Sequence, residues 1–292
     1  KDQLAEALGA GREVDKVRVT LESIFLKLEL KELITPVIIQ YQGGSNALLQ
    51  AKQLSRFGRD VFLADAYREH LFGLPFVARR WSRSVAKLYN PTDKGIGTGF
   101  LVDERYIATA RHVVDKLPAN FEIALESGQH SEHMANQIPR RLEYLTIHRP
   151  QQAALDIALV ELREPVTDVK PIRIEKEWGL LQEVVVLGYP PVPHATDSYL
   201  LANRGEVSST IRLTTGMDAM LISCLLRGGN SGGPVLNQWG HVIGVVSENL
   251  VAQISPEEVD LTQGLGFAAA HSARWIKEML EERGKTIPYA RQ

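Results

Sequence analysis

The 292-residue chain has the composition of an ordinary globular protein, with 44% hydrophobic and 23% charged residues. Its formal net charge of −2 argues against a nucleic-acid-binding role, because such proteins usually carry a basic patch or stripe. The sequence contains no apolar run of about 18 residues, so we expect no membrane-spanning helix and no membrane partner. A chain of this length forms one or two domains.

The first part of the chain has a helical pattern. An apolar stripe with helical spacing runs from Val17 to Leu28. Residues 47–57 and 60–71 predict two further helices. We therefore expect a small all-α domain over residues 1–78. Two roles are open for it: a structural cap, or an adaptor that recruits a protein partner or restrains an active site.

The rest of the chain, residues 79–292, changes to short apolar strands separated by turns, a pattern typical of two packed antiparallel β-barrels. The basic segment 79–83 is interpreted as a solvated linker in front of the first strand. A last helix is predicted after Ser272, with an apolar face of Trp275, Ile276, Met279 and Leu280, and it ends at Gly284. The strands are expected at 85–89, 100–102, 106–108, 121–125, 155–162, 184–188, 220–225, 234–236, 242–247 and 266–270.

A glycine-rich segment, Gly229-Asn230-Ser231-Gly232-Gly233-Pro234, is the strongest functional signal in the chain. The glycines allow a tight turn that exposes the Ser231 hydroxyl, and Gly229 can adopt backbone angles barred to other residues. The N–H groups of Gly229 and Ser231 can then converge on a developing oxyanion. Taken alone, the segment is equally compatible with a plain β-turn.

Two upstream residues are candidate partners of this serine. His112 follows a predicted return strand, and Asp156 stands at the start of an apolar strand. Each alone favours a non-catalytic interpretation: a structural or exposed histidine, and an aspartate in a turn or cap. The chain order His112, Asp156, Ser231 is the order that a chymotrypsin-like catalytic triad requires.

Over roughly residues 84–282, the chain resembles the trypsin-like serine peptidase superfamily, and within it the bacterial high-temperature-requirement proteases. The resemblance implies a mainly β, two-barrel, chymotrypsin-like protease domain that follows the all-α domain. The motifs that carry it, besides the serine segment, are Gly97-Thr98-Gly99-Phe100, Thr109-Ala110-Arg111-His112-Val113-Val114, Asp156-Ile157-Ala158-Leu159, Gly188-Tyr189-Pro190, Val242-Ile243-Gly244-Val245 and Gly264-Leu265-Gly266-Phe267-Ala268.

This resemblance implies a serine endopeptidase that cleaves proteins or peptides through an acyl-enzyme. Ser231 would be the nucleophile, His112 the general base and then acid, and Asp156 the residue that orients His112. Gly229 and Ser231 would form the oxyanion hole. Nothing in this chemistry needs a cofactor, and the eight histidines include no His-Glu-x-x-His metal pair, so we expect no metal.

Specificity follows from the same resemblance. Leu225 falls where the base of the primary specificity pocket lies, and Leu265 falls near its wall. These residues predict a medium aliphatic residue before the scissile bond, and no aspartate supports a preference for Lys or Arg. Ser247, Glu248 and Asn249 fall where the substrate backbone pairs as an added strand.

The chain also departs from the family. Arg111 stands where a small residue is usual, and His271 lies in a segment that commonly contains proline. Asn230 replaces the aspartate that pairs with a new N-terminus in digestive trypsins, so activation by trimming is not expected. No PDZ domain is expected, because the chain ends at Gln292.

Cys224 is the only cysteine, so no intrachain disulfide can form. Its apolar neighbours indicate a buried filler rather than a nucleophile. The lack of disulfides fits a reducing compartment, and we expect a cytoplasmic location. Export stays open, because exported bacterial proteases also lack disulfides and the chain starts at Lys1 rather than at methionine.

Two alternatives to an active endopeptidase are a non-catalytic pseudoprotease that only binds, and a latent protease that acts only with a partner. An esterase of the α/β-hydrolase type is excluded. That fold requires Ser before Asp before His in the chain, together with a Gly-x-Ser-x-Gly elbow.

Overall fold

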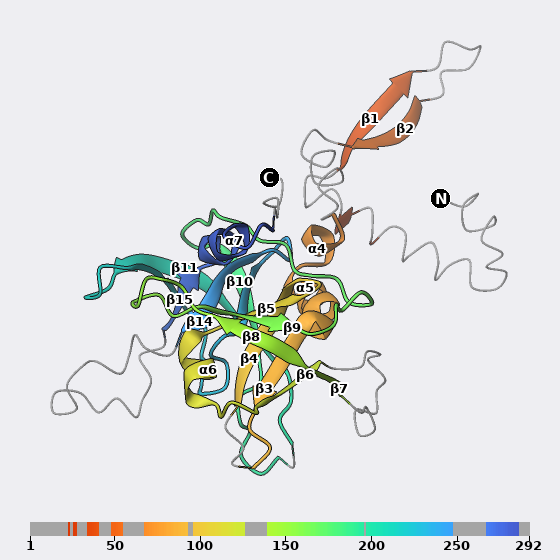
Figure 1. Ribbon diagram of the computed structural model, residues 1–292. Coiled ribbons are helices and arrows are strands. Elements are labelled where there is room, and N and C mark those ends of the chain that lie inside the picture. The colour runs from red at the N-terminus through yellow and green to blue at the C-terminus, as the bar shows by residue number, and fades with distance from the viewer. Residues whose placement is uncertain are drawn as a thin grey trace. The chain divides into compact units, whose positions relative to one another are not determined.

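The computed structural model describes residues 67–92, 96–125, 139–195, 197–247 and 267–285, the backbone of 34–40 and 48–54, and three isolated positions before residue 28. The chain divides into two compact units, Lys1–Gly73 with Arg291–Gln292, and Leu74–Ala290. Figure 1 traces both along the chain. The first boundary therefore falls at Gly73, earlier than the predicted boundary after residue 78.

In the first unit, the helix predicted over residues 47–57 is wrong. Strand β2 (Leu48–Leu54) occupies that segment and pairs antiparallel with β1 (Ile34–Gln40) in a two-stranded sheet. The residues of β2 favour helix locally, but pairing with the β-branched strand β1 overrides that weak preference. An all-α unit is therefore not confirmed.

Little of the other predicted helices falls within the described residues. Helix α4 (Tyr67–Phe72) coincides with the end of the helix predicted over 60–71. The stripe from Val17 to Leu28 lies almost wholly outside the described residues.

The interpretation of residues 79–83 as a solvated linker is also wrong. Helix α5 (Leu74–Trp81) and the short 3₁₀ helix η2 (Ser82–Ser84) occupy this region and belong to the second unit. The exposed fractions of Leu74, Val77 and Trp81 are 7%, 0% and 6%. Their spacing of three and four residues places them on one helix face. Only that face packs inward, while Arg79 remains exposed.

The second unit contains two β layers. Its N-terminal half is a seven-stranded antiparallel sheet in the order β7-β6-β3-β4-β5-β9-β8, and its C-terminal half is a closed barrel in the order β10-β11-β12-β15-β14-β13. The sheet strands are β3 (Val85–Tyr89), β4 (Ile96–Asp103), β5 (Tyr106–Thr109), β6 (Glu122–Leu125), β7 (Arg140–Leu142), β8 (Tyr144–His148) and β9 (Ala158–Leu162). The barrel strands are β10 (Glu183–Gly188), β11 (Leu201–Arg212), β12 (Asp218–Ile222), β13 (Pro234–Asn237), β14 (Val242–Ser247) and β15 (Ala268–Ser272).

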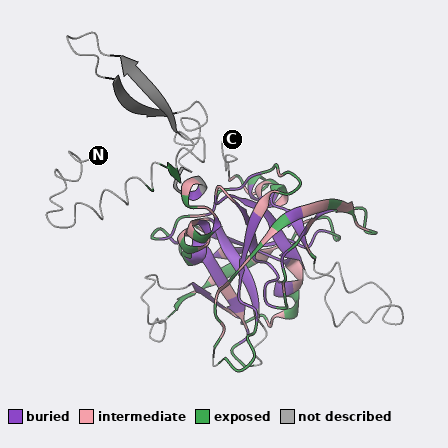
Figure 2. Ribbon diagram, turned by 180° about the vertical axis from the view of Figure 1, so that it is seen from behind, coloured by how far each residue is buried: buried purple, intermediate pink, exposed green. Residues whose placement is uncertain are grey.

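The central strands carry continuous apolar runs because both of their faces are buried (Figure 2). In β4, Phe100 and Val102 belong to one core cluster while Leu101, between them, belongs to another. Strand β10 shows the same pattern, because Val185 and Val186 belong to different core clusters. Successive side chains of a strand point to opposite faces, so a continuous apolar run serves two cores.

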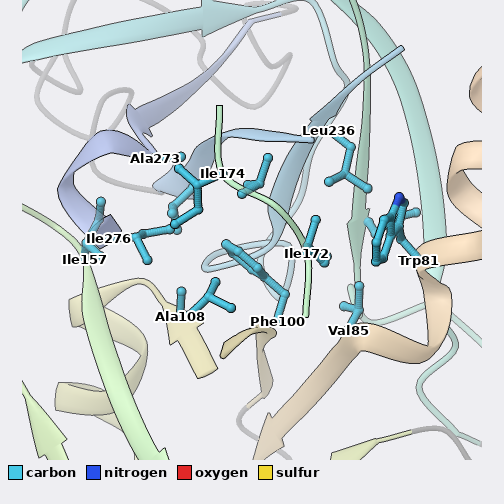
Figure 3. Packing of buried hydrophobic residues seen from close by; sticks show 14 of the residues in the cluster. Trp81, Val85, Phe100, Ala108, Ile157, Ile172, Ile174, Leu236, Ala273 and Ile276 are labelled. Atoms are coloured by element: carbon cyan, nitrogen blue, oxygen red, sulfur yellow. The ribbon is translucent and has the colours of Figure 1, made fainter. Parts of the chain in front are cut away.

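One of these clusters is shared by both halves, and we call it the seam cluster. Figure 3 shows Phe100 and Ala108 of the sheet, Leu236 of the barrel and Trp81 of α5 converging there. The connecting segment crosses the same region, where Ile172 N–H donates to Leu101 O and Val242 N–H donates to Arg173 O. The two halves therefore share one continuous interior.

The sequence prediction of the second unit is largely confirmed. Strands β3 and β14 have the predicted bounds. Helix α7 (Arg274–Glu281) buries Ile276, Met279 and Leu280 as predicted, and Gly284, at φ +71°, follows it. The Ser272 hydroxyl accepts the Arg274 N–H at 3.3 Å, although Ser272 itself ends β15. Strands β7, β8 and β11 were not predicted.

Candidate active site

His112 lies in the first turn of α6 (Arg111–Lys116), directly after β5. Figure 1 shows α6 beside β4. A Cβ added to Gly97 of β4 would come within 2.2 Å of Val113, so a glycine is what lets the helix approach the strand this closely. A sheet strand and a packed helix thus fix the backbone of His112.

Asp156 holds His112 at two points. His112 Nδ1 lies 2.7 Å from Asp156 Oδ2, and the His112 backbone N–H donates to Asp156 Oδ1 at 2.8 Å. The two side chains are 11% and 9% exposed. The structure therefore brings these two predicted residues together, with the imidazole orientation fixed by both carboxylate oxygens.

Ser247 joins this pair at the end of β14. Its hydroxyl donates to Asp156 Oδ2, the oxygen that also contacts the imidazole, and Ser247 is 5% exposed. From the sequence, Ser247 was predicted only to pair with a substrate backbone. Its contact with Asp156 was missed, since a serine at the end of an apolar strand gives no signal for a partner 91 residues away.

The hydrogen bonds also set the protonation of the pair. Burial alone would raise the pKa of Asp156, but the hydrogen bonds from His112 and Ser247 and the adjacent imidazole outweigh it and lower that pKa. An ionised carboxylate only accepts hydrogen bonds, so Nδ1 of His112 carries a proton. In the neutral imidazole, Nε2 is then the acceptor nitrogen.

Ser231 lies in a turn between β12 and β13 and is 5% exposed. Gly229 and Gly232, on either side of it, have φ of +92° and +82°, values that only glycine adopts readily. Space requires glycine here as well. A Cβ at Gly229 would lie 2.4 Å from Tyr189 O, and one at Gly232 would lie 2.2 Å from Thr98 O.

The serine turn is joined to the strands that carry His112. The Thr98 N–H of β4 donates to Ser231 O at 2.9 Å, and Thr98 O accepts the Thr109 hydroxyl at 2.6 Å. A Cβ at Gly232 would also meet Ala110 N at 2.7 Å. The backbone beside Ser231 therefore packs directly against the residues that precede His112.

The N–H groups of Gly229 and Ser231 were predicted to form an oxyanion hole. Neither donates to an acceptor in the parts of the chain that the structure describes. The neighbouring amides are used: Asn230 N–H donates to Arg227 O at 3.1 Å, and Gly232 N–H to Val246 O at 2.8 Å. The N–H of Ser231 itself and that of Gly229, two residues before it, are thus the amides of this turn that can donate to a ligand.

Arg111, unusual beside the histidine, is held by its own surroundings. Its Nε lies 3.2 Å from the Asp115 carboxylate, and its guanidinium donates to Ala153 O at 3.0 Å. Arg149 shares Asp115 at 2.8 Å. The cluster ties α6 to the segment before Asp156, and Asp115 offsets the added charge.

His271 is a second buried imidazole in this region, 2% exposed on β15. Burial lowers its pKa, while the negative charge of Asp156 acts in the opposite direction. His271 is therefore neutral at neutral pH and adds no positive charge beside the pair.

Burial also raises the pKa of Cys224 to about 12, which confirms an inert filler rather than a nucleophile.

The predicted specificity residues are less well defined. Leu225 is 66% exposed, so the described residues do not enclose it as the floor of a pocket. Glu248, Asn249 and Leu265 lie outside the described residues. The cleavage preference stays a prediction.

Within the described ranges, no three His, Cys, Asp or Glu side chains are grouped closely enough to hold a metal ion. The helices described in the structure include none long and apolar enough to cross a membrane.

The family model for the trypsin-like peptidase domain matches residues 97–245, which is just over half of the chain. The chain belongs to this trypsin-like peptidase family. Both candidate partners and the serine turn lie inside the matched range.

Proteins with similar sequence and solved structures with a similar fold are also known. The chain is 27% identical over 184 residues to "Uncharacterized protein y4bJ" of Sinorhizobium fredii, with 59% of this chain but only 25% of that protein covered. Rv3671c from M. tuberculosis, solved in an inactive form, is similar with a TM-score of 0.51 and 20% identity, over 73% of this chain and 92% of that one. A serine endoprotease from Yersinia pestis is similar at the same TM-score and identity, over 70% of this chain and 64% of that one. At this identity the structural likeness concerns the chymotrypsin-like fold.

Proposed function

We propose that the protein is a serine endopeptidase in which Ser231 is the nucleophile, His112 the base and Asp156 the orienting carboxylate. The observation that carries this is the double hold of Asp156 on His112, at 2.7 Å through Nδ1 and 2.8 Å through the backbone N–H. This hold leaves Nε2 as the proton acceptor, the state that a base needs.

In this mechanism, Nε2 of His112 takes the hydroxyl proton as Ser231 Oγ attacks the carbonyl carbon of the scissile bond. The negative charge moves to the carbonyl oxygen, where the N–H groups of Gly229 and Ser231 stabilise it. Asp156 stabilises the imidazolium, and the hydrogen bonds from His112 and then Ser247 keep its carboxylate ionised against the effect of burial.

The imidazolium then gives its proton to the leaving amine, and the peptide bond breaks to leave an acyl-enzyme on Ser231. Water, deprotonated by the same imidazole, hydrolyses this ester and restores the serine. No redox step or group transfer to a cofactor is needed, so we propose that the enzyme uses none.

The rival is a pseudoprotease that keeps the fold and only binds. A fluorophosphonate probe on the intact chain separates the two, because the probe reacts only with an activated serine. We expect labelling of the wild type and none of Ser231→Ala. Hydrolysis of a fluorogenic peptide library should fall about 10⁶-fold in Ser231→Ala, the loss known for the triad serine of subtilisin.

Lack of labelling together with lack of hydrolysis in the folded wild type would overturn the proposal. A wild type that stays inert alone but cleaves after a partner binds the first unit would instead support the latent form.

We further propose that substrates are proteins or peptides with an aliphatic residue before the scissile bond. The N-terminal unit, with a partner, would control access or activity, and the site of action would be cytoplasmic. The first two rest on the sequence patterns around Leu225 and in residues 1–78, and the third rests on the single cysteine, Cys224, which leaves no intrachain disulfide. Cleavage-site profiling of a proteome digest by the full chain tests the first of them.

A further inference from the structure

Thr98 in β4 joins the two halves of the protease unit through its N–H and its hydroxyl, while its carbonyl stays bonded within the sheet. Its N–H donates to Ser231 O, and its carbonyl accepts the Thr109 hydroxyl. Its own hydroxyl donates to Gly229 O at 2.6 Å and accepts the Tyr189 N–H at 3.0 Å. Thr98 is fully buried, with 0% exposed.

The direction of the hydroxyl proton is fixed by its two partners. An amide N–H only donates and a carbonyl oxygen only accepts, so the proton of the Thr98 hydroxyl has to point at Gly229 O. The Thr98 hydroxyl therefore donates one hydrogen bond and accepts another at the same time, and a single orientation of the side chain satisfies both. In a buried site such a bond is both stronger and costlier to lose than at the surface.

This bond holds one end of the peptide that joins Gly229 to Asn230. The Asn230 N–H, at the other end of the same peptide, donates to Arg227 O at 3.1 Å. A peptide is planar, so holding its oxygen and its N–H fixes the plane. The N–H groups of Gly229 and Ser231 belong to the peptides directly before and after it in the chain, so their directions depend on this plane and on the backbone angles of Gly229 and Asn230.

Because residue 229 is a glycine, its backbone conformation depends on contacts with neighbouring residues. At φ +92°, Gly229 lies in a region open mainly to glycine, and glycine has no side chain of its own to restrict rotation. The Tyr189–Pro190 backbone packs against one side of Gly229, and the Thr98 hydroxyl holds its carbonyl.

We propose that the Thr98 hydroxyl is a positioning residue for the oxyanion hole: it orients the peptide between Gly229 and Asn230 and thereby aims the two amide donors. This inference rests on the proposed peptidase function. Thr98 acts through the backbone that it holds.

The test compares three variants of the full-length protein. Thr98→Val keeps the volume and branching but removes the hydroxyl, and Thr98→Ser keeps the hydroxyl. Ser84→Ala is the control for the loss of a buried hydroxyl bond, because Ser84 is 2% exposed and donates to Lys170 O at 2.8 Å. All are assayed well below their melting temperatures, with a fluorogenic peptide that has leucine before the scissile bond.

We expect Thr98→Val to lower kcat about 100-fold, the effect of misplacing a catalytic donor by about 1 Å, with KM unchanged. Affinity for a boronic acid analogue of the peptide should fall in parallel, because its tetrahedral adduct on Ser231 occupies the oxyanion hole. Thr98→Ser should restore both values, and Ser84→Ala should keep them.

If Thr98→Val keeps its kcat and boronate affinity while the wild type is active, this inference fails and the proposed function stands. It fails equally if Thr98→Val and Ser84→Ala lose the same share of kcat, or if Thr98→Ser is as impaired as Thr98→Val. A folded wild type that neither reacts with fluorophosphonate nor cleaves peptide overturns both.

Discussion

The hydroxyl of Ser247 and the imidazole of His112 share one oxygen of Asp156. Oδ2 accepts from both side chains, while Oδ1 accepts the His112 backbone N–H. The carboxylate thus receives three donors in a site where its side chain is 9% exposed. Such saturation keeps the carboxylate charged and prevents it from rotating.

Removing the Ser247 hydroxyl tests this arrangement. Ser247→Ala should lower kcat about 10-fold, because a hydrogen bond to a charged group contributes about 1.5 kcal/mol or more. KM should stay the same, because alanine keeps the backbone groups predicted to pair with substrate. Ser209→Ala, which removes a surface hydroxyl on β11, serves as the control in the same steady-state assay. Equal kcat values for the two variants would contradict the role of Ser247.

Gly232 and Gly216 form a matched pair for the serine turn. Both have a left-handed φ, +82° and +80°, but a Cβ at Gly216 meets nothing within 4 Å whereas one at Gly232 meets Thr98 O at 2.2 Å. Gly216→Ala should cost about 1 kcal/mol of unfolding free energy through φ strain alone. Gly232→Ala should lower the unfolding free energy by about 3 kcal/mol or more, and it should also lower the peptidase activity. Urea titrations measure both, and similar losses would show that the turn can relax.

His241 makes stability depend on pH. Burial, with a smaller effect of the positive charge of Arg173, lowers the pKa of His241 from 6.5 to about 4. Between these values the unfolded chain binds a proton that the folded chain excludes, so stability rises with pH. We expect up to about 3 kcal/mol to be lost as the pH falls from 6.5 to 4.

The measurement is the unfolding free energy of His241→Gln across that pH range. The variant should show a flatter slope than the wild type, although not a level one, because burial lowers the pKa of His271 in the same direction. His194→Gln, at an exposed loop position, should keep the wild-type slope. An unchanged slope in His241→Gln would mean that His241 binds its proton in the folded state.

The unit boundary predicts how much of the N-terminus can be removed. A chain that starts at Leu74 keeps α5 and should unfold in one cooperative thermal transition. A chain that starts at residue 79 lacks Leu74 and Val77, which pack in the seam cluster, and should lose about 3 kcal/mol or more. Calorimetry on both proteins decides this. Equal stability would place the boundary after residue 78, as the sequence predicted.

The sequence predicted the second unit well because its strands are buried on both faces. Continuous apolar runs such as 242–247 have few alternative structures, and the serine turn needs glycine for reasons of both angle and space. The three missed strands are different. Within β11 (Leu201–Arg212) only Val207 is buried, the other side chains are half-buried or exposed, and the polar sequence of the strand carries little periodic hydrophobic signal.

The site was predicted in the same uneven way. His112, Asp156 and the serine turn stand in motifs, so the sequence alone singled them out. The contacts of Ser247 and Thr98 depend on register between distant strands, with 91 and 131 residues between the bonded partners. Local sequence does not encode such pairings. The same limit explains α5, whose tertiary packing overrode the pattern of a basic linker.

The seam cluster has an evolutionary consequence. Phe100, Ala108 and Leu236 are buried core residues of the fold (Figure 3). They also pack the sheet next to His112 against the barrel whose strands β12 and β13 flank Ser231. The same positions therefore contribute to the stability of the fold and, under the proposed function, to the alignment of His112 with Ser231. Sequence drift in this family should be slow there and compensated in pairs across the seam, while the outer faces of the strands vary independently.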